Sequence, residues 1–162
     1  MTERVFAPWV QPIAEELGHR RADVSAFARS APEEIWERPS GVDDWTCKDI
    51  MSHLAAGTGK QHQALVRAVL SNTRVDPNLF GNAEVVNGRD VEERRAQSID
   101  TIIAEYEADT EELLDLLAQL TEEDQGRRQK GFDQTFGEAL PIFGRHELEH
   151  LTQLRAAAEG IE

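Results

Sequence analysis

The chain has 162 residues, of which 40% are hydrophobic, and a formal net charge of −14 from 17 Lys and Arg against 31 Asp and Glu. This length predicts one domain over residues 1–162, large enough to fold without a disulfide or a structural metal. So acidic a surface would repel a nucleic-acid backbone or an anionic bilayer, and the sequence has neither a signal-peptide pattern nor a long apolar run, so we expect a cytoplasmic protein without nucleic-acid or membrane partners.

The first predicted element is a helix from Pro12 to about Arg29. Apolar residues recur there at intervals of three and four, and a proline suits the first turn of a helix. A short turn follows at Pro32 and carries Ile35 and Trp36. Strand-like alternation of apolar and polar residues is scarce in the whole chain, so helices should dominate the fold.

The second predicted helix has the clearest start. Thr46 can cap it, with Asp49 completing a capping box and Trp45 packing on Ile50 as a hydrophobic staple. Its apolar stripe continues at the helical period to about Asn72. The sequence therefore predicts one continuous helix of about seven turns.

The only cysteine, Cys47, falls in the first turn of this helix. A single thiol excludes a disulfide framework, a Cys-rich zinc module and a CxxC redox pair. The helix dipole should lower the pKa of the thiol at this position. We nevertheless interpret Cys47 as a packing residue rather than a redox group.

Residues 73–97 form the longest stretch without helical periodicity, and turn signals occur at Asp76-Pro77 and Asn87-Gly88. We predict a crossover connection here. A connection of this length lets the helices on either side of it run parallel. Ser98 then caps a third predicted helix, whose apolar positions keep the helical period to Leu120.

The fourth predicted helix begins at about Thr135 or Glu138 and ends near Gly160. Thr135 and Glu138 fit a capping box, which places Pro141 beyond the first turn, where it should kink the helix. The four predicted helices, joined by two short connections and one long one, indicate an all-α four-helix bundle.

Three of the five histidines are candidates for a shared metal site. His146 and His150 have the i, i+4 spacing that puts two imidazoles on one helical face, within reach of one divalent ion. His53 lies beside the apolar stripe of its own helix, at a height compatible with that pair. His62 comes nine positions later and points roughly the opposite way, so we expect it on the surface.

Residues 146–150 also match HExxH, the zinc-protease motif in which the first Glu is the general base. Gln153 and Ala156 stand where the metzincin extension needs a glycine and a third histidine, so we set the protease aside. Glu147 falls within the apolar stripe and needs a partner. We favour an ion pair with an Arg or a hydrogen bond to an imidazole over a role beside the metal as an orienting residue or base.

Residues 45–54, Trp-Thr-Cys-Lys-Asp-Ile-Met-Ser-His-Leu, resemble the W-T-x-x-[DE]-x-x-x-H-L segment of the DinB-like superfamily. Residues 146–154 resemble its closing H-x-x-x-H-x-x-Q-[IL]. The resemblance implies a four-helix bundle of up-down-down-up topology, with a long crossover between helices two and three, and often a homodimer. It also implies a divalent metal (Zn, Ni or Fe) held by His53, His146 and His150.

Members of this superfamily with known activity are thiol S-transferases that use mycothiol, bacillithiol or glutathione, among them a mycothiol-dependent maleylpyruvate isomerase. The chain length suits the bundle without the isomerase's additional C-terminal domain, so we do not expect the isomerase itself. A metal on three histidines leaves a position where an entering thiol is ionised. Our leading hypothesis is metal-dependent transfer of a low-molecular-weight thiol to a small-molecule electrophile. The alternatives are a non-catalytic, metal-containing ligand-binding or stress-response bundle and a metal-dependent hydrolase.

Overall fold

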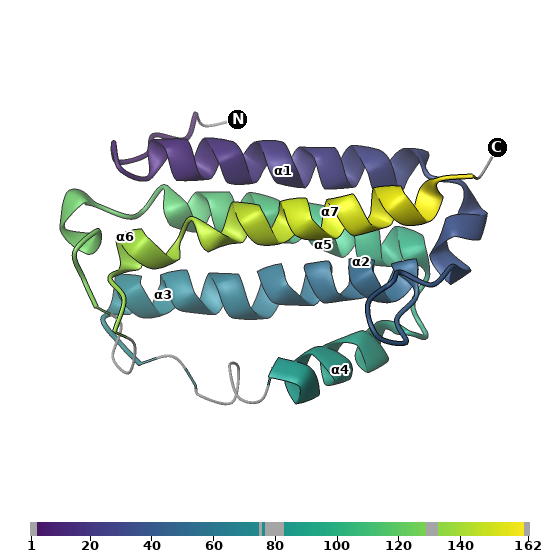
Figure 1. Cartoon of the computed structure of the whole chain (residues 1–162). Coiled ribbons are helices and arrows are strands. Elements are labelled where there is room, and N and C mark those ends of the chain that lie inside the picture. Colours follow the sequence, from purple (N-terminus) through teal and green to yellow (C-terminus); the bar gives the residue numbers. More distant parts are fainter. Residues whose placement is uncertain (1–2, 75, 77–82, 129–132, 161–162) are drawn as a thin grey trace.

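The computed structural model describes residues 3–74, 76, 83–128 and 133–160, which form helices and turns with isolated bridges but no strand. Four long helical rods lie side by side (Figure 1), as the predicted four-helix bundle requires. They are α1 (Gln11–Ser30), the continuous run of α2 (Cys47–Ala56), η2 (Gly57–His62) and α3 (Gln63–Ser71), then α5 (Ile99–Leu117) and α7 (Ile142–Ala158). In the described part of the chain no helix is both long and apolar enough to cross a bilayer.

Side-chain contacts fix the directions of the rods. α1 and α5 run antiparallel, because Arg29 near the end of α1 pairs with Asp100 near the start of α5, and Arg4, before α1, pairs with Asp115 near the end of α5. The α2–α3 rod runs parallel to α5, and Gln63 donates a hydrogen bond to the carbonyl of Asp109. His53 of α2 lies beside His150 of α7, so these two rods run antiparallel with the later part of each facing the earlier part of the other. The topology is therefore up-down-down-up.

The capping signals in the sequence are confirmed. The Thr46 hydroxyl accepts a hydrogen bond from the backbone N–H of Asp49, and the Asp49 carboxylate accepts one from Thr46. Ser98 caps α5 in a similar way through its side chain. The last predicted helix is broken around Pro141 into α6 (Phe136–Ala139) and α7, as expected from the missing N–H and the bulk of the proline ring.

The long crossover is confirmed, but part of it is helical. Residues Ala83–Arg94 form α4, which packs against α2. The turn predicted at Asn87-Gly88 is wrong, because both residues lie within this helix. Most of the predicted turn at Asp76-Pro77 lies outside the described residues. The helical pattern of α4 was hidden because two of its inward positions hold charged side chains, Asp90 beside Lys60 and Arg94 beside Glu105.

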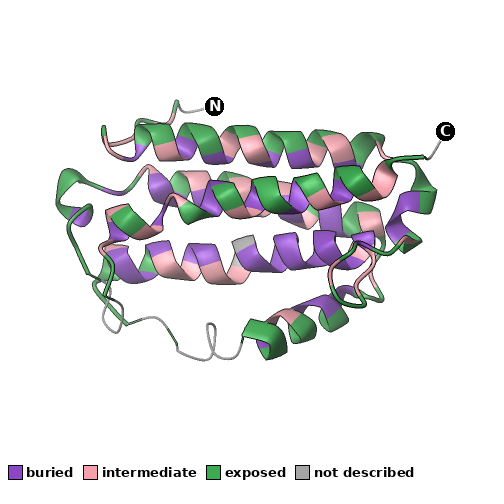
Figure 2. Cartoon of the chain, viewed as in Figure 1, coloured by how far each residue is buried: buried purple, intermediate pink, exposed green. Residues whose placement is uncertain are grey.

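The rods turn their buried residues toward one another (Figure 2), and those residues form two apolar clusters along the bundle. One cluster surrounds Ile50, Leu54 and Tyr106. Cys47 is fully buried in this cluster, in agreement with a packing role. The expected lowering of its pKa is wrong: burial raises the pKa of the Cys47 thiol, although Arg38 opposes the change.

Candidate metal centre

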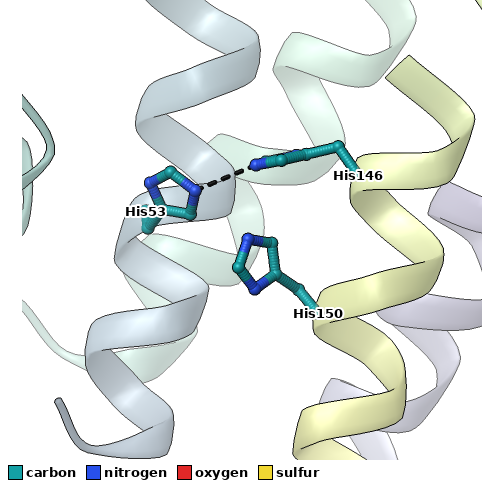
Figure 3. Close-up of side chains that lie close together, drawn as sticks. All are labelled: His53, His146 and His150. Atoms are coloured by element: carbon teal, nitrogen blue, oxygen red, sulfur yellow. Dashed lines mark hydrogen bonds between the residues drawn. The ribbon is translucent and has the colours of Figure 1, made fainter. Parts of the chain in front are cut away.

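Three histidines from two antiparallel helices meet in the bundle (Figure 3): His53 from α2, and His146 and His150 from α7. Each offers a ring nitrogen that lies within 4.8 Å of those of the other two. The Nε2 atoms of His53 and His146 are 2.9 Å apart. The structure therefore brings together all three of the histidines that the sequence singled out.

A glycine on the α2–α3 rod leaves room for one of these rings. Gly57 follows His53 by one turn, and a Cβ atom there would lie 4.0 Å from Cε1 of His146. The Trp45 ring lies 5.5 Å from that of His53, between centroids. His146 thus lies near a glycine and His53 near a large aromatic ring.

Gln153 orients His150. The Nδ1 atom of His150 lies 2.7 Å from Oε1 of Gln153, one turn further along α7. With Nδ1–H donating to this amide oxygen, the lone pair of Nε2 is left for a cation. The sequence motif contains Gln153, but only the structure shows what it contacts.

Burial sets the protonation of the cluster. It lowers the pKa of His53 to about 3, helped by the neighbouring His146 and His150. It also lowers the pKa of His150. These rings are therefore neutral near pH 7, with their lone pairs available. Closely spaced ring nitrogens from three histidines fit a divalent ion such as Zn, Ni or Fe.

Glu147 is fully buried behind the cluster, and both of its carboxylate oxygens accept hydrogen bonds. Oε1 accepts a hydrogen bond from Nη1 of Arg21 at 2.9 Å, and Oε2 accepts one from the Tyr106 hydroxyl at 2.7 Å. Burial raises the pKa of Glu147, but Arg21, His146 and the Tyr106 hydroxyl together outweigh it and lower the pKa to about 2. This is the ion pair with an Arg that the sequence favoured.

His62 is buried, so the expected surface position is wrong. Its ring stacks on Phe143 at 4.0 Å between centroids and lies 5.8 Å from the ring of His146. The reason is η2, a π-helical segment over Gly57–His62. A π-helix takes more residues per turn than an α-helix, so the positions after it are rotated relative to an ideal α-helix. His62 therefore turns toward α7 rather than away from it.

A cavity of about 890 Å³ opens onto the three histidines. Its walls are the loop before α2, part of η2 and the first half of α4. The crossover helix that the sequence analysis missed thus forms one side of the site. Beside the histidines, the polar and charged side chains of its lining are Asp43, Asp44, Gln61, Glu84 and Asn87.

Comparison with known protein families places this site in context. Residues 17–157 match the family described as the mycothiol maleylpyruvate isomerase N-terminal domain. The chain belongs to this family. The match confirms the resemblance to the DinB-like superfamily, of which the family is a member. No curated protein and no solved structure gives a significant match. All three histidines, Glu147 and Gln153 lie within the part of the chain that matches the isomerase N-terminal domain family.

Proposed function

We propose that this protein is a metal-dependent transferase that places a low-molecular-weight thiol, of the mycothiol or bacillithiol type, on a small electrophile. The observation that carries the proposal is the convergence of His53, His146 and His150 on the wall of an open cavity. The family description supports the choice of thiol, because it names mycothiol. A cavity of about 890 Å³ is also within the size range of small-molecule sites.

The chain's own residues prepare the site for this chemistry. His53, His146 and His150 would hold the metal, and a divalent cation held there supplies the Lewis acidity that lowers the pKa of an entering thiol. Gln153 fixes the orientation of His150. The cavity beside the histidines would hold the electrophile close to the sulfur, so that the two reactants meet in one orientation.

We assign Glu147 to positioning rather than to proton transfer. Its two oxygens are bonded to Arg21 and Tyr106, and its Oε1 lies 3.9 Å from Nδ1 of His146. A general base must reach the proton it abstracts within about 3.2 Å or through one water. Glu147 is not among the residues that line the cavity. This arrangement argues against the activity of an HExxH protease and against that of a hydrolase that uses Glu147 as its general base.

The test is turnover by protein purified without an affinity tag and supplied with Zn, Ni or Fe. Mycothiol and bacillithiol are each assayed with 1-chloro-2,4-dinitrobenzene, and the thioether product is followed by absorbance. We expect turnover that disappears with a chelator and falls to background in His53→Ala. Gln153→Ala should lower metal affinity or activity about 10- to 100-fold.

The matched control is His19→Ala, because His19 is exposed on α1, away from the cavity lining. It should retain both metal binding and turnover. Metal binding that depends on His53, without turnover of any thiol, would instead support the non-catalytic binding protein. Metal content unaffected by His53→Ala would reject the proposed site.

A further inference from the structure

The cavity over the three histidines is lined by negative charge. Asp43 and Asp44, in the loop before α2, and Glu84 of α4 all contribute to its wall. Among the described lining residues there is no Lys or Arg. Residues 77–82, which precede α4 and are not described, read Pro-Asn-Leu-Phe-Gly-Asn and add no charge.

Local ion pairs do not cancel the charge of Asp43 and Asp44. Asp43 and Asp44 are exposed, and within the described residues neither forms an ion pair. Two cations of the neighbouring elements are held elsewhere: Lys60 and Arg89 each lie 3.3 Å from Oδ1 of Asp90. The wall formed by Asp43 and Asp44 therefore keeps its negative potential.

The net charge that a substrate meets in the cavity is the sum of the side-chain charges and the charge of the bound ion. A divalent cation between neutral imidazoles contributes two positive charges, and Asp43 with Asp44 offsets both. An ionised thiol adds one negative charge. A second substrate that enters beside the thiol therefore meets a net negative surface, which repels carboxylates and attracts ammonium groups. Carboxylate oxygens also accept hydrogen bonds from hydroxyl and ammonium donors.

We propose that this cavity selects substrates that are hydroxylated or positively charged where they face Asp43 and Asp44, and discriminates against dicarboxylates. This inference rests on the proposed function, because it takes the metal and the thiol from it. Maleylpyruvate, named in the family description, is a dicarboxylate and by this reasoning is a poor substrate for this chain. A polyhydroxylated thiol and a neutral or amine-bearing electrophile suit the cavity better.

The test measures binding rather than turnover, with three thiols in which two methylene groups separate the sulfur from a terminal group of different charge. They are 2-aminoethanethiol, 2-mercaptoethanol and 3-mercaptopropionate. Each is titrated into cobalt-loaded protein, and its Kd is obtained from the sulfur-to-cobalt charge-transfer absorption. We express selectivity as the Kd of 3-mercaptopropionate divided by that of 2-aminoethanethiol, which compares the same pair of thiols in every variant.

The deciding variant is Asp43→Asn combined with Asp44→Asn. Asp43 has a φ of 44°, a left-handed conformation that asparagine also accepts, so the loop should keep its shape. We expect the selectivity ratio to fall about threefold to tenfold relative to the unchanged protein. Raising the salt from about 50 mM to about 500 mM should reduce the ratio in the unchanged protein, because these carboxylates are exposed.

The matched control is Glu122→Gln combined with Glu123→Gln. It removes the same charge from η4 (Glu122–Asp124), which follows α5 at the opposite end of the bundle from the start of α2 (Figure 1). The control should leave the ratio unchanged. An equal ratio in the unchanged protein and the Asp43/Asp44 variant would overturn this inference alone. Failure of cobalt or of every thiol to bind would overturn the proposed function as well.

Discussion

Arg21 and Glu147 form a buried ion pair that ties α1 to α7 directly behind the histidine cluster. Their side chains are 1% and 0% exposed. Arg21 also lies over the ring of Tyr106, 3.6 Å from its centroid, and donates a hydrogen bond to the backbone carbonyl of the same residue. The sequence indicated that Glu147 needed a partner. It could not indicate which of the arginines would supply it, because Arg21 is 126 positions away.

Removing Arg21 should be costly, because it leaves the charge of Glu147 buried without compensation. We expect Arg21→Ala to lower the free energy of unfolding by about 3–5 kcal/mol, measured by urea denaturation of the metal-free protein. Arg29→Ala breaks the solvent-exposed pair with Glu107 and should cost much less, because water screens this pair. Replacing both partners, in Arg21→Met with Glu147→Leu, should recover much of the loss. Equal losses in Arg21→Ala and Arg29→Ala would contradict this account.

At the scale of the element, the π-helical segment η2 determines which residues of the second rod face α7. This segment comes after His53, begins directly where α2 ends, and itself ends at His62, whose ring it brings against Phe143. A π-helical segment inside an α-helical rod is often found at a functional site, and here it lies beside the proposed metal centre. Gly57 begins this segment and faces His146.

Two substitutions at Gly57 should distinguish its effect on the stability of the helix from its effect on the geometry of the metal site. A Cβ atom would sit at ordinary contact distance from His146, so Gly57→Ala should raise the free energy of unfolding by about 0.5–1 kcal/mol and leave metal binding intact. Gly57→Leu extends into the position of the His146 ring and should weaken metal affinity about tenfold or more. Competition with a chelator measures that affinity. Equal metal affinity in the two variants would show that the ring does not depend on this space.

At the scale of the whole molecule, several buried groups make stability depend on pH in the same direction. Burial lowers the pKa of His53 and of His62 to about 3 from an ordinary value of 6.5. Below pH 6.5 the unfolded chain therefore binds protons that the folded protein does not. Glu147, whose pKa is lowered from 4.5 to about 2, adds a further loss below pH 4.5. Acid thus destabilises the folded state through each of these groups.

We expect the metal-free protein to lose stability as the pH falls from 6.5 toward 3, by up to about 1.4 kcal/mol per pH unit for each histidine. Urea denaturation at several pH values between 7.5 and 4.5 measures the slope. His62→Phe keeps an aromatic ring against Phe143 and removes one of the imidazoles whose pKa is lowered by burial, so it should make the slope smaller. A free energy of unfolding that stays constant over this range would contradict the burial of these rings as neutral groups.

The sequence by itself determined the bundle, its capped helix starts, the break at Pro141 and the three histidines that meet. These follow from local signals: helical period, i, i+4 spacing, capping residues and proline geometry. Only the tertiary structure decided the position of His62, the helix α4 and the partnership of Arg21 with Glu147. The physical reason is that each depends on groups distant in sequence. Local spacing sets which way a side chain points from an ideal helix, whereas packing sets where the helix departs from that ideal and which buried charges find partners.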